Sequence, residues 1–336
     1  MREFVVLMAA LMASNALAID AMLPALPAIG EALRVGEANQ RQLVITAYLI
    51  GFGVSQIAYG PLSDRFGRKG LLVGSLVFYA IFATLAGIAA SFSLLLAARA
   101  MQGVAASGTR VLVIAIVRDR FQGSAMAQIM SLVMIIFMIV PVLAPAFGQA
   151  VLAVATWRHI FIGLGVYAAA LIVWTLLRLP ETLPEDRRCP LSAAHLADAL
   201  VTLVRTRQSI GNTLVSTLTL GALFAFIGSI QQIIFDVFGR PDLIALAFAA
   251  IAGPMAFSSY ANSRLVMRLG PRRLLLWALV AFTVSALVHL LVSLIVSESI
   301  WTFVALQAVT LACFGLVGAN ASALTMEPLG HIAGTA

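Results

Sequence analysis

The chain has 336 residues, of which 62% are hydrophobic and only 10% are charged, and its mean hydropathy is +1.03. Soluble globular domains are nearer to about 45–50% apolar, so this composition excludes an ordinary soluble domain. The formal net charge of +7 does not indicate nucleic-acid binding, because the basic residues fall in short loops between long apolar runs.

Apolar runs long enough to cross a bilayer as helices, about 20 residues each, recur along the whole chain. The first run is too long for the apolar part of a cleaved signal peptide. The sequence predicts ten spans, at 4–29, 42–62, 70–90, 93–117, 124–152, 160–179, 209–235, 243–262, 274–296 and 300–322. We therefore expect an all-α polytopic membrane protein.

The loops between the spans carry an uneven share of the basic residues. If the N-terminus is cytoplasmic, fifteen of the 21 Lys and Arg residues lie in inside segments and four lie in outside segments. Basic residues accumulate in cytoplasmic loops, so we expect a cytoplasmic N-terminus.

A polar connection at 181–208 separates a six-span part, 1–180, from a second part, 209–336. From Leu191 onward this connection has the pattern of an amphipathic helix lying on the membrane surface. A solvated linker is an equal alternative.

The link between the second and third spans, "GPLSDRFGRKG" at 60–70, combines charge with glycine. Gly60, Gly67 and Gly70 are expected to give the freedom for a sharp turn. Asp64 is expected to accept hydrogen bonds from the N-terminus of the following helix. The basic residues of the link are Arg65, Arg68 and Lys69. A loop that only sets topology is the alternative interpretation.

A similar pattern recurs six spans later, in "NSRLVMRLGPRRLLL" at 262–276. This repetition is expected of a transporter built from two parallel six-helix halves. The second copy has Ser263 or Arg264 near the position of Asp64, so it lacks the acid.

Several motifs together carry a family resemblance. "GPLSDRFGRKG" resembles the signature loop of the major facilitator superfamily, and "LAARAMQGVAA" at 96–106 is similar to the span-4 motif of its proton-coupled antiporters. Further segments resemble the Bcr/CflA drug-resistance subfamily. These are "IDAMLPALPAI" (19–29), "VPVLAPAFGQ" (140–149), "WRHIF" (157–161), "LPETL" (179–183), "NSR" (262–264) and "EPLGHIAGTA" (327–336).

The resemblance implies the major facilitator fold, with two pseudo-symmetric six-helix halves of which the second is incomplete here. It also implies that the 60–70 cluster closes the cytoplasmic side. Pro141, Pro145 and Gly148 would then form the antiporter bend of span 5, although an ordinary kink is an alternative. Because the family has twelve spans, we expect the chain to be a fragment that does not transport alone.

Asp20 is the one acid well inside a predicted span. A charge there costs about 2.5–3.5 kcal/mol on insertion scales, so such acids usually face a cavity or a partner. Asp20 and Arg99 have depths that differ by about 5 Å, so pairing between them is expected, directly or through water. A carboxylate that alternates between Arg pairing and protonation suits proton coupling. A static ion pair and an interfacial Asp20 are the alternatives.

Further polar and aromatic side chains in the spans are candidates for a cavity wall. Arg110 would meet a substrate or would snorkel to the inner surface. His289 is interpreted as a packing residue. The other candidates, each with an interhelical hydrogen bond or a lipid contact as the alternative, are Tyr48, Gln56, Gln102, Phe224, Gln231 and Gln232.

The resulting expectation is a secondary transporter of a bacterial inner membrane, a monomer that exports hydrophobic or amphiphilic small molecules in exchange for protons. No phosphate-binding loop, metal pattern or cofactor motif is present in the sequence, so the proton gradient is the expected driving force. The rival classes are an integral-membrane enzyme, an inactive remnant of a transporter, and an exporter of an endogenous metabolite. The sequence does not reveal the substrate.

Overall fold

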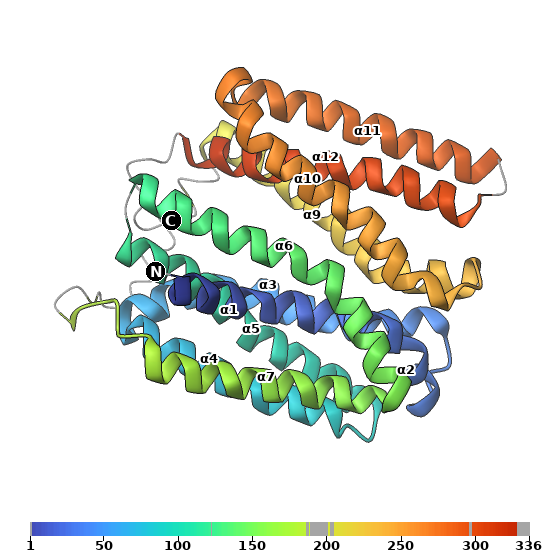
Figure 1. Ribbon diagram of the computed structural model, residues 1–336, viewed down its shortest axis with the longest axis horizontal. Coiled ribbons are helices and arrows are strands. Elements are labelled where there is room, and N and C mark those ends of the chain that lie inside the picture. The colour runs from blue at the N-terminus through green and yellow to red at the C-terminus, as the bar shows by residue number, and fades with distance from the viewer. Residues whose placement is uncertain are drawn as a thin grey trace. The chain divides into compact units, whose positions relative to one another are not determined.

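A computed structural model describes residues 2–121, 123–185, 188, 201, 205–295 and 298–327. The described residues are helical with short links, and no strand occurs among them (Figure 1). They divide into two compact units, unit 1 at Met1–Leu191 and unit 2 at Ser192–Ala336.

Unit 1 contains seven α-helices and two short 3₁₀ turns within its described residues. These elements are α1 (Arg2–Asp20), η1 (Leu23–Ala25), α2 (Leu26–Ala32), η2 (Ala38–Gln42), α3 (Leu43–Phe66), α4 (Arg68–Gly87), α5 (Phe92–Arg120), α6 (Gly123–Val154) and α7 (Trp157–Arg178).

The described part of unit 2 begins its long helices after the central connection. Its elements are α9 (Arg207–Gln232), the π-helical turn η4 (Ile233–Val237), η5 (Pro241–Leu243), α10 (Ile244–Leu269), α11 (Pro271–Ile295) and α12 (Ile300–Met326).

Nine helices among the described residues are long and apolar enough to cross a membrane. The remaining predicted span, 124–152, corresponds to α6, a helix of 32 residues in which the described apolar part is Leu143–Val154. The prediction of an all-helical polytopic membrane protein is thereby confirmed. The predicted amphipathic helix after Leu191 lies outside the described residues.

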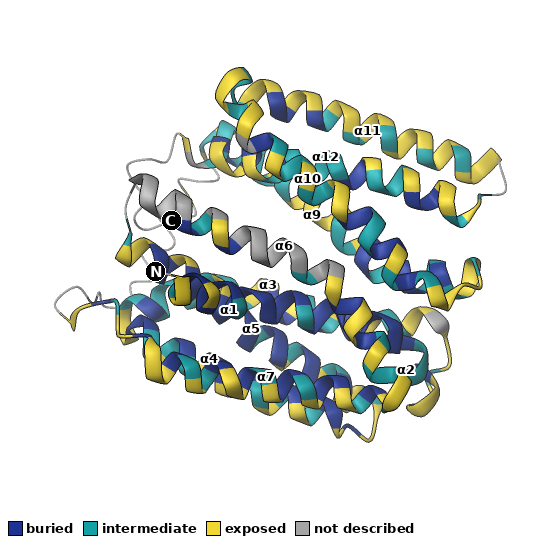
Figure 2. Cartoon of the chain, in the orientation of Figure 1, coloured by how far each residue is buried: buried dark blue, intermediate teal, exposed yellow. Residues whose placement is uncertain are grey.

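The first span is interrupted, whereas the sequence predicted one continuous run. α1 ends at Asp20, and the chain continues through a 3₁₀ turn into α2. Pro24 explains the break, because proline has no N–H to donate to the carbonyl of Asp20. Among the spans of unit 1 whose burial is described, Arg2–Ala32 is the most enclosed, and α1 is mostly dark in Figure 2. An interrupted helix inside a bundle leaves backbone polar groups that only neighbouring helices can satisfy.

The link between α3 and α4 is shorter than the sequence predicted. α3 continues to Phe66 and α4 begins at Arg68, so Gly67 is the single linking residue. Its φ of 88° and ψ of 162° lie in a region that glycine adopts without strain. Gly60 and Gly70 lie inside helices, so the expectation that they supply turn freedom was wrong.

The predicted internal repeat has a counterpart in the backbone. Gly270 links α10 to α11 with φ 77° and ψ 156°, nearly the conformation of Gly67. Both glycine N–H groups donate to the carbonyl four residues earlier, at 3.1 Å for Gly67 and 2.9 Å for Gly270. Counting back from the two glycines places Met267 at the position of Asp64. The earlier assignment of Ser263 or Arg264 was therefore out of register.

Candidate functional site

Arg99 of α5 is fully buried within unit 1. Its Nη2 donates to the Ala18 carbonyl at 3.0 Å, its Nε donates to the Val44 carbonyl at 3.2 Å, and its Nη1 donates to Gln102 Oε1 at 2.7 Å. The guanidinium also stacks over the ring of Tyr48, 4.4 Å from its centroid. One side chain therefore holds α1 and α3 against α5.

Asp20 is the last residue of α1 and is only 3% exposed. Its Oδ1 has no hydrogen-bond partner, and it forms no ion pair with Arg99. The expected direct pair is thus absent from this conformation. The guanidinium instead bonds to Ala18, two residues away, where the end of α1 leaves carbonyl groups without intrahelical donors.

Tyr48 belongs to a second buried polar network beside Arg99. Its hydroxyl donates to Asn15 Oδ1 at 3.1 Å, and Asn15 Nδ2 donates to Thr109 Oγ1 at 3.0 Å. The Tyr79 hydroxyl donates to the Ser14 carbonyl at 3.2 Å. Sequence reasoning missed Asn15 and Thr109, although an amide within an apolar span was a detectable signal.

The helices at this site approach closely through glycine. A Cβ on Gly103 of α5 would overlap the Tyr48 carbonyl oxygen, and a Cβ on Gly51 of α3 would overlap that of Ala100. A Cβ on Gly148 of α6 would overlap the carbonyl oxygen of Ala21, next to Asp20. Pro145 is buried in the same helix, whereas the side chain of Pro141 lies outside the described residues.

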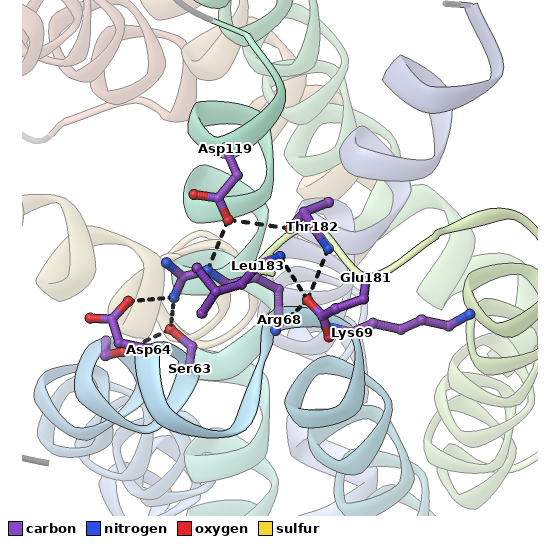
Figure 3. A network of polar contacts seen from close by, with 9 residues as sticks. Ser63, Asp64, Arg68, Lys69, Asp119, Glu181, Thr182 and Leu183 are labelled. Atoms are coloured by element: carbon purple, nitrogen blue, oxygen red, sulfur yellow. Dashed lines mark hydrogen bonds and ion pairs between the residues drawn. The ribbon is translucent and has the colours of Figure 1, made fainter. Parts of the chain in front are cut away.

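At the Gly67 link, Arg68 is buried and bonds to residues from three segments (Figure 3). It pairs with Asp64 at 2.8 Å and with Asp119 of α5 at 3.0 Å, and it donates to the Ser63 hydroxyl. We call the set Ser63, Asp64, Arg68, Asp119 and Glu181 the α4 N-terminal cluster.

Glu181 accepts the hydrogen bonds that the sequence assigned to Asp64. Its carboxylate accepts from the backbone N–H of Arg68 at 2.9 Å and of Lys69 at 3.1 Å (Figure 3). Asp64 cannot fill this role because it lies in the last turn of α3 and faces the Arg68 side chain. The "LPETL" segment that supplies Glu181 was recognised only as a motif.

Electrostatics at Glu181 favour the anion. Partial burial raises the pKa of its carboxyl. Hydrogen bonds from the backbone N–H groups of Leu183, Arg68, Lys69 and Thr182 lower this pKa by more than burial raises it. The net pKa is below the ordinary value. A carboxylate at the N-terminus of α4 also interacts favourably with the helix dipole.

The remaining predicted site residues are not gathered with Asp20. Arg110 is exposed on α5, Arg65 stacks over Phe66 at 5.3 Å, and Gln56 is half-buried. In unit 2, Phe224 is half-buried and Gln231 is buried. Gln102 is the one of these candidate cavity residues that bonds directly to Arg99.

Unit 2 contains a cavity of about 610 Å³ beside the π-helical turn, α11 and α12. His289, which the sequence analysis interpreted as a packing residue, lies in it with Nε2 2.9 Å from Glu298 Oε1. The N-cap serines Ser91 and Ser299 align α5 with α12 and place Gln307 at the position of Arg99. In unit 1 the Phe161 ring of α7 packs on Arg99. Gln307 also lines this cavity.

The described residues form a polytopic helical membrane protein that divides into two compact units. The model of the Major Facilitator Superfamily matches residues 8–336. The chain belongs to this superfamily, and it is a transporter rather than an enzyme.

Curated relatives agree with this assignment. The chain is 30% identical over 321 residues to the MFS-type transporter YdgK of Bacillus subtilis, covering 95% of this chain and 79% of that protein. It is 27% identical to a bicyclomycin resistance protein homolog of Haemophilus influenzae, and the match covers 95% of this chain and 80% of that protein. It is 26% identical to the multidrug resistance protein MdtL of Escherichia coli, and the match covers 94% of this chain and 78% of that protein.

Solved structures show the same fold at low sequence identity. A bacterial homolog of the human lysosomal transporter Spinster, inward-facing, superposes with a TM-score of 0.73 at 16% identity, covering 94% of this chain and 73% of that one. The xylose transporter XylE from E. coli, partially occluded and inward open, superposes with a TM-score of 0.70 at 11% identity, covering 96% and 84%.

Proposed function

We propose that the protein exports hydrophobic or amphiphilic small molecules in exchange for protons, by alternating access between its two units. The observation that carries the proposal is Asp20, a buried carboxyl at the interruption of α1 with an oxygen lacking a hydrogen-bond partner. Secondary transporters commonly place coupling sites at discontinuous helices.

The surroundings of Asp20 give its two protonation states different partners. Burial disfavours the carboxylate, and so does the negative end of the α1 dipole, at which Asp20 lies. Arg99 is the cation that would stabilise the anion in this mechanism, but here its guanidinium is bonded to Ala18, two residues before Asp20, and to Val44 and Gln102. In this mechanism, deprotonation of Asp20 redirects Arg99 toward the carboxylate, and protonation returns it to the carbonyl groups.

The α4 N-terminal cluster has a second role in the proposal. It fixes the ends of α3 and α4 to α5 and to the segment after α7, so these elements move as one body. We infer that the cluster faces the cytoplasm of a bacterial inner membrane, because the basic residues of the chain concentrate on this side. Rigid bodies of this kind are what rocking motions between transporter halves require.

The substrate class is inferred from the relatives. Two of them carry names of bicyclomycin or multidrug resistance, and apolar binding surfaces accept many amphiphilic compounds. An exporter of an endogenous metabolite would share the same coupling machinery. Bicyclomycin and ethidium susceptibility of a hypersensitive bacterial host that expresses this chain would separate the two.

The coupling test uses Asp20→Asn, which keeps the size of the side chain but cannot exchange a proton. In inverted vesicles with an imposed pH gradient, we expect the variant to insert normally and to lose uphill ethidium transport. Asp242→Asn is the matched control, because Asp242 is an exposed carboxylate paired with Arg240. Uphill transport by Asp20→Asn at the wild-type rate would refute the proposal.

A further inference from the structure

Arg110 is a charged side chain within the membrane-spanning part of α5. The helix ends at Arg120, so Arg110 lies ten residues, or about 15 Å, from that end. The hydrocarbon core of a bilayer is about 30 Å thick, so the backbone of Arg110 lies near the midplane. An ionised side chain at this depth is costly unless it meets water, a partner or a ligand.

The guanidinium of this arginine has no hydrogen bond or ion pair with any residue that the structure describes. Three described acids at the same end of unit 1 are already paired. Asp64 and Asp119 bond to Arg68, and Glu3 bonds to Arg178. The charge of the arginine is therefore available to an anion that does not belong to the described part of the chain.

Arg110 projects from the packed side of α5 and not from its lipid side. Ala106, Val113 and Val117 lie on the same face of the helix, and all three are fully buried. Met101, nine residues before Arg110, points from the opposite side of the helix and is 40% exposed. Met101 thus marks the side of α5 that contacts lipid, and the exposed Arg110 opens onto a gap on the protein side.

The surface beside the guanidinium is apolar. Ile114, one helical turn after Arg110, lies on the same face and is 38% exposed. A guanidinium donates two parallel hydrogen bonds to a carboxylate or a sulfonate, and an exposed apolar side chain next to it accepts the hydrophobic body of the same molecule. The combination therefore fits an anionic amphiphile.

We propose that Arg110 binds the carboxylate or sulfonate group of an anionic amphiphile, which the protein accepts as a substrate. This inference deepens the proposed function, on which it rests for the claim that the bound molecule is exported. An unpaired guanidinium also repels organic cations, so Arg110 sets the charge preference of the binding site. Anionic lipid head groups share the same chemistry, but they would reach α5 from the side of Met101.

The experiment measures binding to the purified full chain in nanodiscs of phosphatidylcholine. The probes are fluorescein, an anion, and pyronin Y, a cation with the same three-ring xanthene core, and fluorescence anisotropy gives the Kd of each. We expect Arg110→Gln to raise the Kd of fluorescein at least tenfold and to leave the Kd of pyronin Y unchanged or lower it. Arg118→Gln is the matched control, because Arg118 is exposed in the last turn of the same helix. Its two Kd values should stay within about twofold of the wild type.

Two further measurements distinguish charge recognition from a structural role. Arg110→Lys keeps the charge but loses the planar fork, so its Kd for fluorescein should fall between those of the wild type and Arg110→Gln. Ethidium counterflow in proteoliposomes, without a gradient, should be as fast in Arg110→Gln as in the wild type or faster. Equal fluorescein binding by wild type and Arg110→Gln, or a loss of both probes by the same factor, would overturn the inference.

The source of the anion and the proposed function are tested separately. Nanodiscs that contain phosphatidylglycerol should bind fluorescein as well as neutral ones, and competition by this lipid would show a lipid site instead of a substrate site. Binding requires no proton gradient, so Asp20→Asn should keep the preference of the wild type for fluorescein over pyronin Y. Failure of proton-driven transport would overturn the proposed export, whereas an unchanged preference in Arg110→Gln would overturn this inference alone.

Discussion

Glu181 accepts hydrogen bonds from the first two backbone N–H groups of α4, those of Arg68 and Lys69, at 2.9 and 3.1 Å. The N-terminal N–H groups of a helix lack intrahelical partners, and Gly67, the residue before α4, has no side chain to supply one. Glu181 fills this gap from the segment after α7. The start of the central connection is therefore part of the α4 N-terminal cluster.

Glu181→Gln is expected to destabilise this cluster. The amide keeps one acceptor oxygen but loses the charge, so we expect a loss of about 0.5–2 kcal/mol, the usual range for a helix cap. Thermal unfolding of the purified protein in detergent measures the effect. Glu185→Gln is the control, because Glu185 is exposed and makes only a 3.5 Å pair with Arg188. Equal melting temperatures for the two variants would contradict the assignment.

The contribution of Glu181 should depend on pH in a defined direction. Its pKa in the folded protein is lower than the ordinary value of 4.5, although burial alone raises it, because backbone N–H groups of four residues bond to the carboxylate. Its stabilisation is therefore complete above about pH 4.5 and is lost as the pH falls through the folded-state pKa. The difference in melting temperature between wild type and Glu181→Gln should stay constant from about pH 8 to pH 5 and shrink below about pH 4.5. A difference that grows on acidification would have the wrong sign.

The close contact of α3 and α5 predicts opposite results for two glycines of one helix. Gly51→Ala would place a methyl group against the Ala100 carbonyl oxygen, and overpacking of this kind costs about 1–3 kcal/mol. Gly53→Ala meets nothing within 4 Å and removes the entropic cost of glycine in a helix, so it should be neutral or slightly stabilising. Melting temperatures in detergent provide the comparison, and a stable Gly51→Ala protein would show that the helices separate easily.

Replacement of Arg99 should change how transport depends on pH. In Arg99→Ala the Asp20 anion has lost its nearby cation, so deprotonation needs a higher pH and the pH optimum of counterflow should rise. Arg99→Lys keeps the charge but loses the planar fork that bonds to Ala18, Val44 and Gln102. The pH optimum of Arg99→Lys should stay closer to that of the wild type than the optimum of Arg99→Ala, while the melting temperature of Arg99→Lys should fall. An unchanged optimum in Arg99→Ala would mean that the two residues do not communicate.

The helical architecture was predictable because it depends on local properties of the chain. Runs of apolar residues predicted the membrane-spanning helices, and the repeated glycine between basic residues predicted the related links at Gly67 and Gly270. The ends of helices were less predictable. α3 extends to Phe66 across Pro61, because the bonds of Arg68 to Ser63 and Asp64 stabilise its last turn.

The sequence contains a signal for the interruption of the first span, but this signal is ambiguous. Pro24 and Pro27 are compatible with either a kinked helix or a broken one, and the sequence analysis predicted a continuous run. The break persists because Arg99, more than 70 residues away, satisfies a carbonyl at the end of α1. Backbone groups freed inside a membrane are tolerated only when neighbouring helices supply such partners.

By itself the sequence determined which residues can span a membrane, which loops concentrate positive charge, and which polar residues are costly enough to require partners. Only the tertiary structure decided the partners. Arg99 bonds to carbonyl groups of Ala18 and Val44 rather than to Asp20, and Glu181 rather than Asp64 caps α4. The physical reason is that every backbone carbonyl and N–H group looks alike in a sequence, whereas helix breaks and close glycine contacts determine which of them remain available to a distant side chain.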